Sequence, residues 1–391
     1  MKAFRRKKKR NCSTPAKNKK IKWTAPFKLL FHSFLASLNI FLVIFLLASA
    51  WSDLISPEKN ILFAYLGLIF PVLLFINTCF FIYWIILKKW LMIFILTLTF
   101  AACWIPFSNY CPFHIKTEVL PQEDMIKVLS YNVMSFAYKN HTQESPNKII
   151  QYVAESGADI VCLQEYLVSE RANLMNSKDV AKALPMYPYI AEIIFSSPEK
   201  RYKFGLAVLS KFPITKSRKI DISSAYNGAS VHEINVKGKK IIVFNNHLES
   251  FKLTAEDRSH YSDMITHGNL ESFDGLRGSI QQKLGQAFRI RAGQAELIAG
   301  EIRKMNAYYA IVCGDFNDTP ISYVHRVLQG SLVDAYAESG FGLGISYNRN
   351  FFLFRIDHIF HSSSMESYNC RVDTRVNLSD HYPIYCYLKL N

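Results

Sequence analysis

Long apolar runs fill the first third of the chain. Residues 29–52, 61–87 and 90–107 contain no Asp, Glu, Lys or Arg, and the runs are 24, 27 and 18 residues long. A helix needs roughly 20 apolar residues to cross the hydrocarbon core of a bilayer. The pattern therefore predicts a membrane module over residues 29–110 with about three transmembrane helices. The third run is the shortest, and two crossings are the alternative.

The pattern changes at residue 124, where short apolar runs begin to alternate with polar stretches. Each run has the length and the bounding polar or Gly residues that are typical of a buried strand. We predict strands at residues 126–133, 159–165, 204–210, 231–236, 240–248, 308–313, 355–360 and 384–388. Helical spacing predicts helices at residues 145–156 and 280–305. Residues 124–391 are therefore expected to form an α+β domain, joined to the membrane module by a linker over residues 111–123.

Basic residues are concentrated outside the predicted α+β domain. Residues 1–117 carry 16 Lys or Arg and 2 Asp or Glu, whereas residues 118–391 carry 30 and 29. The net charge of +15 therefore belongs almost entirely to the N-terminal part. The near-neutral C-terminal part gives little support for a broad nucleic-acid-binding surface, although local basic patches remain compatible with this balance.

The placement of Lys and Arg predicts how the chain lies in the membrane. Residues 1–28 form a basic tail, and Lys88-Lys89 separates the second and third apolar runs. Short segments rich in Lys and Arg stay on the cytoplasmic side. With three crossings, we expect a multi-pass protein of the cell (inner) membrane, with a cytoplasmic tail and an extracytoplasmic C-terminal domain. Two crossings would leave that domain in the cytoplasm.

The eight cysteines are scattered and lack the spacing of a zinc site. Cys162 and Cys313 lie in predicted core strands, where a small buried thiol is the expected role. Cys370 and Cys386 would pair only in an oxidising compartment, and the sequence leaves their state open.

Residues 308–320 combine a buried strand with polar side chains at its end. The apolar run ends at Gly314, which permits a tight turn, and Asp315 and Asn317 then alternate with Phe316. Asp315 and Asn317 can therefore point the same way. A carboxylate and an amide in this position can hold a water molecule or a phosphate oxygen, although the same residues also occur in ordinary turns.

Other predicted strands also end in carboxylates, amides or imidazoles. These residues are Asn132, Glu165, Asn245, His247, Asp357, Asp380 and His381. Oxygen ligands of this kind suit Mg²⁺, with Mn²⁺ as the alternative, rather than zinc. The set fits hydrolysis of a phosphate ester, in which water attacks, a metal neutralises the developing charge and a histidine assists.

The order of these motifs resembles that of the endonuclease/exonuclease/phosphatase superfamily. The motifs are Asn132, Leu163-Gln164-Glu165, Asn245-Asn246-His247-Leu248, Gly314-Asp315-Phe316-Asn317, Arg355-Ile356-Asp357 and Ser379-Asp380-His381-Tyr382-Pro383. Together they cover about residues 125–390. The resemblance implies a four-layer, two-sheet αβ sandwich like that of deoxyribonuclease I, with the active site where the strands end at one rim.

The resemblance also implies a role for each site residue. Glu165 is expected to be the main metal ligand, and Asn132 and Asp380 are expected to help hold the metal or the water around it. Asp315 is expected to orient or deprotonate the attacking water.

The remaining catalytic roles follow from the same resemblance. Asn317 is expected to hold a phosphate oxygen. His247 and His381 are expected to stabilise the transition state or to protonate the leaving group, and Asp357 is expected to orient His381.

Substrate contacts are expected from Asn245, Tyr347 and Arg291. Arg291 lies on the predicted helix over residues 280–305, where a solvated helix face is the alternative to a phosphate contact. Two positions depart from the family pattern. Asn246 stands where Thr or Val is common, and Ser346 stands where a Thr is expected before the aromatic residue.

These observations favour a membrane-anchored, divalent-metal-dependent phosphoesterase. Its substrate would be a phosphodiester in nucleic acid or in a lipid head group. The near-neutral domain weakens the nuclease option, because a nuclease usually neutralises several phosphates, and the membrane anchor slightly favours a lipid. The alternative is a catalytically inactive, membrane-tethered binding module of the same fold, against which the complete set of site residues argues. No protein partner can be inferred.

Overall fold

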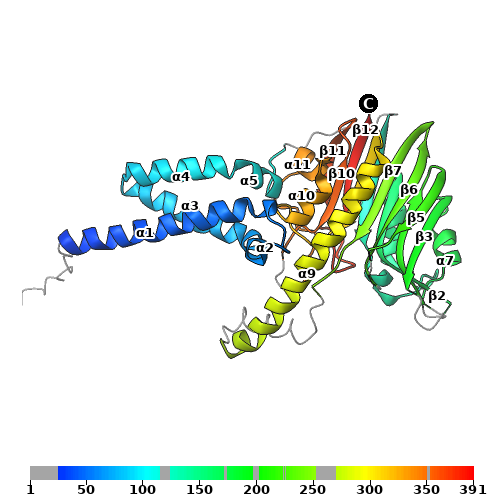
Figure 1. Ribbon diagram of the computed structural model, residues 1–391. Helices are drawn as coiled ribbons and strands as arrows, with labels where there is room; N and C mark the ends of the chain where they lie inside the picture. The colour runs from blue at the N-terminus through cyan, green and yellow to red at the C-terminus, as the bar shows by residue number, and fades with distance from the viewer. Residues whose placement is uncertain are drawn as a thin grey trace, which may run out of the picture.

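The computed structural model describes residues 25–114, 124–170, 174–196, 202–222, 224, 226–251, 270–349 and 353–391. Within these residues, an elongated helical bundle leads into a domain built of two sheets and flanking helices (Figure 1). The predicted basic tail lies outside the described residues up to residue 24. The predicted linker lies outside them from residue 115 to residue 123.

The apolar runs form the helical bundle. Its elements are α1 (Ala25–Ala50), the 3₁₀ helix η1 (Ser52–Leu54), α2 (Ile61–Leu68), α3 (Phe70–Ile86), α4 (Trp90–Ala102) and α5 (Trp104–Tyr110). By length and composition, α1 can cross a membrane on its own. The pairs α2–α3 and α4–α5 each provide a further candidate span only if the two helices of a bent pair count as one. The described residues therefore contain one to three candidate spans.

The second and third apolar runs are bent, which the sequence analysis did not predict. The axes of α2 and α3 meet at 59°, and those of α4 and α5 meet at 57°. Pro71 lies at the start of α3, where its missing N–H and its ring prevent a straight continuation of the preceding helix. Pro106 lies in the first turn of α5. Proline therefore accounts for both breaks.

Buried polar side chains hold the long helices together. Asn39 on α1 donates to Asn77 Oδ1 on α3 at 3.1 Å and accepts a hydrogen bond from Trp84 Nε1 at 2.9 Å. Side-chain hydrogen bonds of this kind bind apolar helices to one another where hydrophobic burial gives little preference. They fix the register of α1 against α3.

Two six-stranded sheets form the α+β domain. The first has the strand order β11-β12-β1-β2-β4-β3, and the second has the order β5-β6-β7-β8-β10-β9. The first sheet contains β1 (Met125–Asn132), β2 (Ile160–Ser169), β3 (Tyr189–Ser196), β4 (Tyr202–Ser210), β11 (Met365–Val372) and β12 (Ile384–Leu390). The second contains β5 (Ile214–Ile220), β6 (Gly228–Val236), β7 (Lys239–His247), β8 (Tyr309–Asp315), β9 (Val333–Asp334) and β10 (Asp357–His361).

Each sheet has one parallel pair near its centre. β1 runs parallel to β2, and β7 runs parallel to β8. Parallel neighbours end at the same edge of a sheet. A hydrogen bond from Asn132 at the end of β1 to Asp315 at the end of β8 shows that the two sheets share this edge. The sequence analysis expects the active site at this edge, and for that expectation we call it the catalytic rim.

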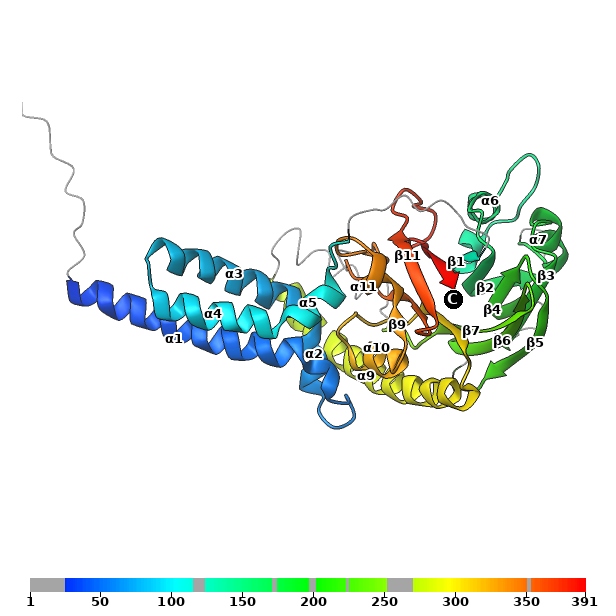
Figure 2. The ribbon, with the colours of Figure 1, turned by 90° about the horizontal axis from the view of Figure 1, so that it is seen from above.

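Helices cover the outer faces of both sheets, which gives four layers (Figures 1 and 2). Apolar side chains from both sheets fill the space between them. α6 (Lys148–Glu155) and α7 (Ser177–Ala183) cover the first sheet, and α9 (Leu270–Met305) and α10 (Tyr323–Gln329) cover the second. Two further short helices are η2 (Met134–Tyr138) and α11 (Ala335–Ser339). The predicted two-sheet sandwich is confirmed.

The predicted core thiols lie where the sequence analysis expected them. Cys162 and Cys313 are buried between the two sheets. Cys370 and Cys386 lie in the same core, and both are free thiols.

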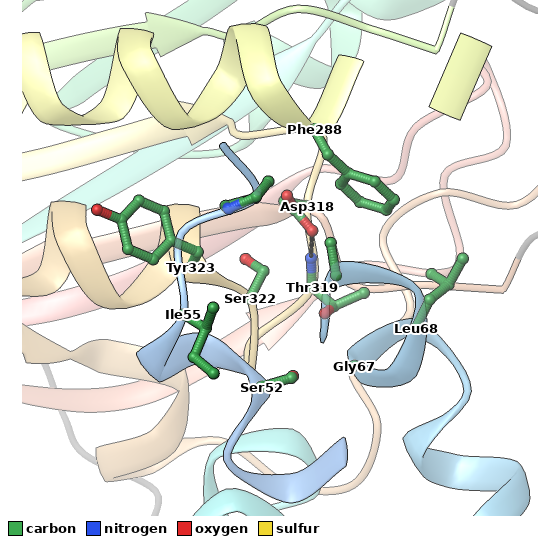
Figure 3. Close-up of a pocket in the computed structure, with 11 residues that line it drawn as sticks. Ser52, Ile55, Gly67, Leu68, Phe288, Asp318, Thr319, Ser322 and Tyr323 are labelled. Carbon is green, nitrogen blue, oxygen red and sulfur yellow. Dashed lines mark hydrogen bonds between the residues drawn. The ribbon is translucent and has the colours of Figure 1, made fainter. Parts of the chain in front are cut away.

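The helical bundle docks directly on the second sheet's side of the α+β domain. Ile321 packs among side chains of α1, α3 and α5, and its carbonyl oxygen accepts a hydrogen bond from Ser52 Oγ at 3.4 Å. A Cβ atom at Gly67 would lie 2.4 Å from Ser52 Oγ, so this glycine permits the close approach of α2. Figure 3 shows η1 and α2 facing the loop that carries Asp318 and Thr319. That loop directly follows the Gly-Asp-Phe-Asn motif.

Candidate active site

Strand register brings the predicted site residues to the catalytic rim. Asp315 at the end of β8 lies opposite His247 of β7 on one side and Asp357 of β10 on the other. Asn132 ends β1, and His381 lies three residues before β12. All five side chains are buried. Residues separated by up to 249 positions in the sequence thus meet at one place.

Asp315 lies at the centre of this group. Its Oδ2 accepts a hydrogen bond from Asn132 Nδ2 at 3.0 Å and lies 3.5 Å from His381 Nε2 and 3.8 Å from His247 Nε2. Burial raises the pKa of Asp315 to about 6, although the two histidines oppose the change. At neutral pH this carboxylate is therefore mostly ionised, yet it is basic enough to accept a proton from water.

Two neighbours fix the orientation of Asp315. Gly314 has a φ of 135°, and a Cβ atom there would lie 1.9 Å from the carbonyl oxygen of Asn246. Only glycine permits that approach of β7 and β8. The backbone N–H of Asn317 donates to Asp315 Oδ1 at 2.9 Å, and Asn317 Nδ2 donates to the carbonyl oxygen of Leu248 at 2.9 Å. Asn317 therefore supports Asp315 and lies at the rim.

His381 and Asp357 form a close pair. His381 Nδ1 lies 2.8 Å from Asp357 Oδ2, which leaves Nε2 directed at Asp315. Burial alone would disfavour the charged imidazole, but the carboxylates of Asp357 and Asp315 raise the pKa of His381 well above its ordinary value. The His381 imidazole is therefore protonated at neutral pH. For His247, burial lowers the pKa, so this second imidazole is neutral.

An irregularity in strand β2, which the sequence did not reveal, positions Glu165. We predicted that the second strand would end at Glu165, but β2 continues to Ser169. Glu165 has a φ of 50°, and the pairing of β2 with β4 shifts register between Leu163 and Tyr166. Such a bulge redirects one side chain without ending the strand. Here it directs Glu165 toward the catalytic rim.

The Glu165 carboxylate connects the buried group to the outside. Its Oε1 accepts a hydrogen bond from Asn132 Nδ2 at 3.1 Å and lies 3.8 Å from His247 Nε2. The side chain keeps 28% of its accessible surface, whereas Asp315 keeps 1%. Burial raises the pKa of Glu165, and the neighbouring charge of Asp380 raises it further. Glu165 is thus the partly open edge of the site.

The donor set of this edge fits a hard divalent cation. Glu165 and Asp380 lie close enough for each charge to disfavour the other, and a cation between them would remove that cost. These two carboxylates offer only oxygen ligands, which suits Mg²⁺ or Mn²⁺. The Asn132 amide directs Nδ2 at Glu165, and its oxygen accepts a hydrogen bond from the backbone N–H of Met134 at 3.1 Å. Asp315, Asp357 and His381 also offer ligand atoms within 4.8 Å of one another, but the hydrogen bond between His381 and Asp357 already occupies this group.

Two of the three residues expected to contact substrate lie away from the rim surface. Asn245 is fully buried between the sheets, where Oδ1 accepts from Gln164 at 2.7 Å and Nδ2 donates to the carbonyl oxygens of Leu163 and Ala207. It lies on the same face of β7 as His247 but two residues deeper. The contacts of Asn245 therefore connect the two sheets beneath His247.

Arg291 is also fully buried. Its Nε donates to Asp318 Oδ2 at 3.3 Å, and its Nη1 donates to the carbonyl oxygen of Glu249 at 2.9 Å. The guanidinium also packs against the rings of Phe251 and Phe288, at 4.5 and 5.0 Å from their centroids. Neither the expected phosphate contact nor the alternative of a solvated helix face describes this environment. Arg291 instead holds α9 to the loop after Asn317.

Tyr347, the third residue expected to contact substrate, lies beside the pair formed by His381 and Asp357. Its ring centroid is 5.1 Å from that of His381. Ser346, which departs from the family pattern, accepts hydrogen bonds from the backbone N–H groups of Ile356 and Asp357 at 3.0 Å each. The smaller hydroxyl residue therefore holds the start of β10 in place.

Sequence reasoning missed Asn227. Its Nδ2 donates to the carbonyl oxygen of Leu248 at 2.8 Å and lies 3.4 Å from His247 Nε2. It precedes β6, so it reaches the rim from a neighbouring strand whose start the apolar pattern placed three residues too late. An Asn directly before a Gly at a strand start is a common turn signal, and nothing else marked it.

A second buried group of His and Asp side chains lies next to the site. His325 Nε2 lies 3.0 Å from Asp334 Oδ2, and His358 Nε2 lies 3.0 Å from the carbonyl oxygen of Asp318. Among the described residues, His358 Nδ1 has no hydrogen-bond partner. All three side chains are buried, so we call this set the enclosed group.

Comparison with known protein families agrees with this geometry. A model described as the Endonuclease/Exonuclease/phosphatase family matches residues 129–381. The chain belongs to this family. Its members are mostly metal-dependent phosphoesterases that typically bind Mg²⁺. A domain of unknown function, DUF8431, matches residues 32–110.

Solved structures from several organisms are similar to this chain at low sequence identity. An endonuclease/exonuclease/phosphatase from Beutenbergia cavernae is 14% identical, with a TM-score of 0.50 over 68% of this chain and 72% of that one. Truncated TDP2 from Caenorhabditis elegans is 17% identical, with a TM-score of 0.46 over 68% and 97%. A mannosyl-6-phosphatase from Bacteroides thetaiotaomicron is 20% identical, with a TM-score of 0.46 over 67% and 99%. No curated protein matches this chain.

Proposed function

We propose that this chain is a membrane-anchored, divalent-metal-dependent phosphodiesterase that cleaves its substrate by attack of water. The observation that carries the proposal is the set of contacts around Asp315. A carboxylate whose pKa is raised to about 6 lies beside one protonated and one neutral imidazole. Such a pairing of groups with shifted pKa values is what acid–base hydrolysis at neutral pH requires.

Each side chain has a defined task in this proposal. Asp315 accepts the proton of the attacking water. His381, which Asp357 keeps protonated, donates a proton to the leaving oxygen. Neutral His247 forms a hydrogen bond to a phosphate oxygen, and Asn317 holds a second one. Glu165, Asn132 and Asp380 would hold a divalent cation, whose positive charge would offset the charge that develops on the phosphate.

The apolar helices support membrane anchoring, and the basic residues support an extracytoplasmic active site. Lys88 and Lys89 lie between α3 and α4, at the end of the bundle away from the α+β domain (Figure 1). Retention of these lysines in the cytoplasm would place the domain on the other side of the membrane. A topology reporter fused after Asn391 tests this placement, and activity of a cytoplasm-specific reporter would contradict it.

The central test is hydrolysis of bis-p-nitrophenyl phosphate by the full chain in detergent. The wild-type protein is expected to release nitrophenol only with Mg²⁺ or Mn²⁺. Asp315→Ala is expected to lose at least about 100-fold of this rate, the lower range for loss of a general base. The matched control is Asp124→Ala, because Asp124 is an exposed carboxylate next to the first residue of β1, at the opposite end of the strand from the rim.

The same measurement separates the second candidate function, a binding module without turnover. Equal rates for wild type and Asp315→Ala, at the level of the buffer, would favour the binding module. Equal loss in Asp124→Ala and Asp315→Ala would show damage to the fold rather than to catalysis. Circular dichroism of each variant distinguishes these results.

A further inference from the structure

We infer that the substrate is a phosphodiester carried by a lipid that remains in the bilayer. The inference rests on the proposed phosphodiesterase function and adds the substrate class and its direction of approach. It depends on how the helical bundle meets the catalytic rim. Two loops of the site are bound to the end of the bundle, and exposed apolar side chains continue from the bundle across this junction.

The first connection is the loop that carries Tyr347. The backbone N–H of Gly342 donates to the carbonyl oxygen of Pro112, just beyond α5, at 2.8 Å. Five residues further, Tyr347 packs against His381. A chain of five residues spans at most about 17 Å. The path from the end of the bundle to His381 is therefore at most about 17 Å of chain and then the contact between the rings of Tyr347 and His381.

The second connection involves both carboxylates of the acid–base set. Ile321, which is buried among α1, α3 and α5, follows Asp315 by six residues, or at most about 20 Å of chain. Arg355 donates a hydrogen bond to the carbonyl oxygen of Asn109 in α5, and it lies two residues before Asp357. The bundle therefore holds the catalytic rim from two sides.

The end of the bundle lies at the membrane surface. α1 has 26 residues and is therefore about 39 Å long, which exceeds a hydrocarbon core of about 30 Å. Trp51 follows the end of α1 directly, and Trp104 begins α5 at the same end. Tryptophan concentrates at the boundary between lipid tails and head groups. The two loops thus attach the catalytic rim at the level of the head groups.

Exposed apolar side chains extend from the membrane helices onto the α+β domain. Trp104, Phe113 and Phe341 are exposed, and the half-buried Phe107 lies between Trp104 and Phe113. Neighbouring ring centroids in this row are 5.8 to 6.1 Å apart. Further exposed apolar side chains lie on the loops beside Tyr347, at Leu343 and Leu353. Large exposed apolar surface in continuity with membrane helices indicates contact with lipid rather than water. We call Phe113, Phe341, Leu343 and Leu353 the lipid-facing band.

An exposed cation lies on the same loop. Arg349 follows Tyr347 by two residues, and its guanidinium Nη2 lies 3.4 Å from the carbonyl oxygen of Ser379, next to Asp380 and His381. A guanidinium beside the site suits the phosphate of a lipid head group. With the lipid-facing band next to it, the loop offers one surface for lipid tails and one charge for the phosphate.

The reaction balances with water as the only co-reactant. Water adds to phosphorus, and the bond between phosphorus and the leaving oxygen breaks. The proton from water passes to Asp315, and the leaving oxygen takes a proton from His381. The products are a phosphomonoester and an alcohol, one of which stays in the membrane with the lipid tails.

The test uses the full chain reconstituted in vesicles of phosphatidylcholine, phosphatidylethanolamine and phosphatidylglycerol with Mg²⁺. Loss of each lipid is followed by mass spectrometry, and bis-p-nitrophenyl phosphate and single-stranded DNA are offered to the same vesicles. We expect hydrolysis of at least one bilayer lipid. We also expect its rate to follow the mole fraction of that lipid in the membrane rather than its bulk concentration.

A double variant, Leu343→Gln/Leu353→Gln, tests the lipid-facing band. It is expected to lower lipid hydrolysis at least 10-fold and to leave hydrolysis of bis-p-nitrophenyl phosphate within two-fold of wild type. The control is Tyr308→Gln, because Tyr308 is also an exposed apolar residue but lies before the first residue of β8, at the end opposite the rim.

Each outcome of these experiments either supports or overturns the lipid inference. Hydrolysis of the soluble ester or DNA without hydrolysis of any vesicle lipid would overturn the lipid inference and leave the phosphodiesterase proposal intact. An equal loss of lipid and soluble-ester hydrolysis in the double variant would also overturn the role of the band. Failure with every substrate would overturn the proposed function, and the lipid inference with it.

Discussion

Two neighbouring groups of buried His and Asp side chains differ in what they can reach. Asp315, Asp357 and His381 at the catalytic rim and the three members of the enclosed group each place their ligand atoms within 4.8 Å of one another. The rim group connects to the partly exposed Glu165, since Asp315 and Glu165 share the amide of Asn132. Residue type alone therefore does not identify the site.

The contacts of the enclosed group end on the protein itself. Asp334 Oδ1 accepts from the backbone N–H of Tyr336 at 2.8 Å and so caps α11, while Oδ2 pairs with His325. His358 packs against the ring of Phe316, with centroids 5.1 Å apart. Burial lowers the pKa of His358 well below its ordinary value, so this imidazole is neutral. Such a group stabilises a fold and has no access to substrate.

The protonation states of His381 and His358 differ because the two imidazoles have different neighbours. His381 faces two carboxylates, which raise its pKa despite burial. His358 faces a backbone carbonyl and His325, and these neighbours do not offset the cost of charging the buried His358 imidazole. The comparison teaches that a catalytic histidine needs both a charge partner and an opening. Three substitutions test this, ordered by the expected effect on the rate of hydrolysis.

Asp357→Asn is expected to have the largest effect. It removes a charge that raises the pKa of His381, so His381 loses its proton at a lower pH. We expect kcat/KM at neutral pH to fall about 100-fold, and the decline of activity on the alkaline side to move to lower pH. A pH–rate profile with bis-p-nitrophenyl phosphate checks both. An unchanged alkaline limb would show that His381 does not act as the acid.

Glu165→Gln is expected to have an intermediate effect, through the metal. The substitution removes one negative charge from the open edge of the site but keeps the size of the side chain. The Mg²⁺ concentration for half-maximal activity is expected to rise at least about 10-fold, with much of the rate restored at high Mg²⁺. Isothermal titration calorimetry with Mn²⁺ measures the metal affinity of the variant independently of activity. Unaltered metal affinity would remove Glu165 from the proposed ligands.

Asp334→Asn is expected to leave the rate within about two-fold, because the enclosed group does not reach substrate. Its effect is on stability. Burial alone would raise the pKa of Asp334, but the hydrogen bond and charge of His325 hold it below its ordinary value of 3.8. We expect the variant to be less stable at pH 7 by about 2 kcal/mol, the range for a hydrogen bond between charged groups.

The pH dependence of that loss has a definite sign. A carboxyl group whose pKa is lowered on folding stabilises the protein above the unfolded pKa, and this contribution is lost as the pH falls through the folded pKa. The difference in melting temperature between wild type and Asp334→Asn should therefore be full above about pH 4 and should shrink below it. A difference that grows in acid would contradict the assigned ion pair.

Much of the catalytic rim could be predicted because it depends on strand ends. The buried run before Gly314 predicted β8, and Asp315 and Asn317 follow at its end, as the strand pattern placed them. The predicted strands at residues 231–236 and 240–248 are found as the antiparallel neighbours β6 and β7. These are local signals of period and turn chemistry. The buried position of Cys162 and Cys313 followed from the same apolar pattern.

Other features could not be seen locally. Nothing in the residues around Glu165 indicates a bulge, because the bulge arises from the register of β2 against β4. Asn245 and Arg291 are polar residues in plausible positions for substrate contact, yet packing of the second sheet and α9 buries both completely. The burial of a residue depends on which other segments pack against it, and these tertiary neighbours cannot be identified from the local sequence.

By itself, the sequence determined the apolar helices, the α+β sandwich and the family, because each depends on patterns repeated along the chain. Only the tertiary structure decided which carboxylate is buried, which histidine carries a proton and which loops meet the membrane helices. Those properties depend on distances between residues that are far apart in the chain, and on the removal of water around them. Both arise only when the two sheets and the helical bundle pack together.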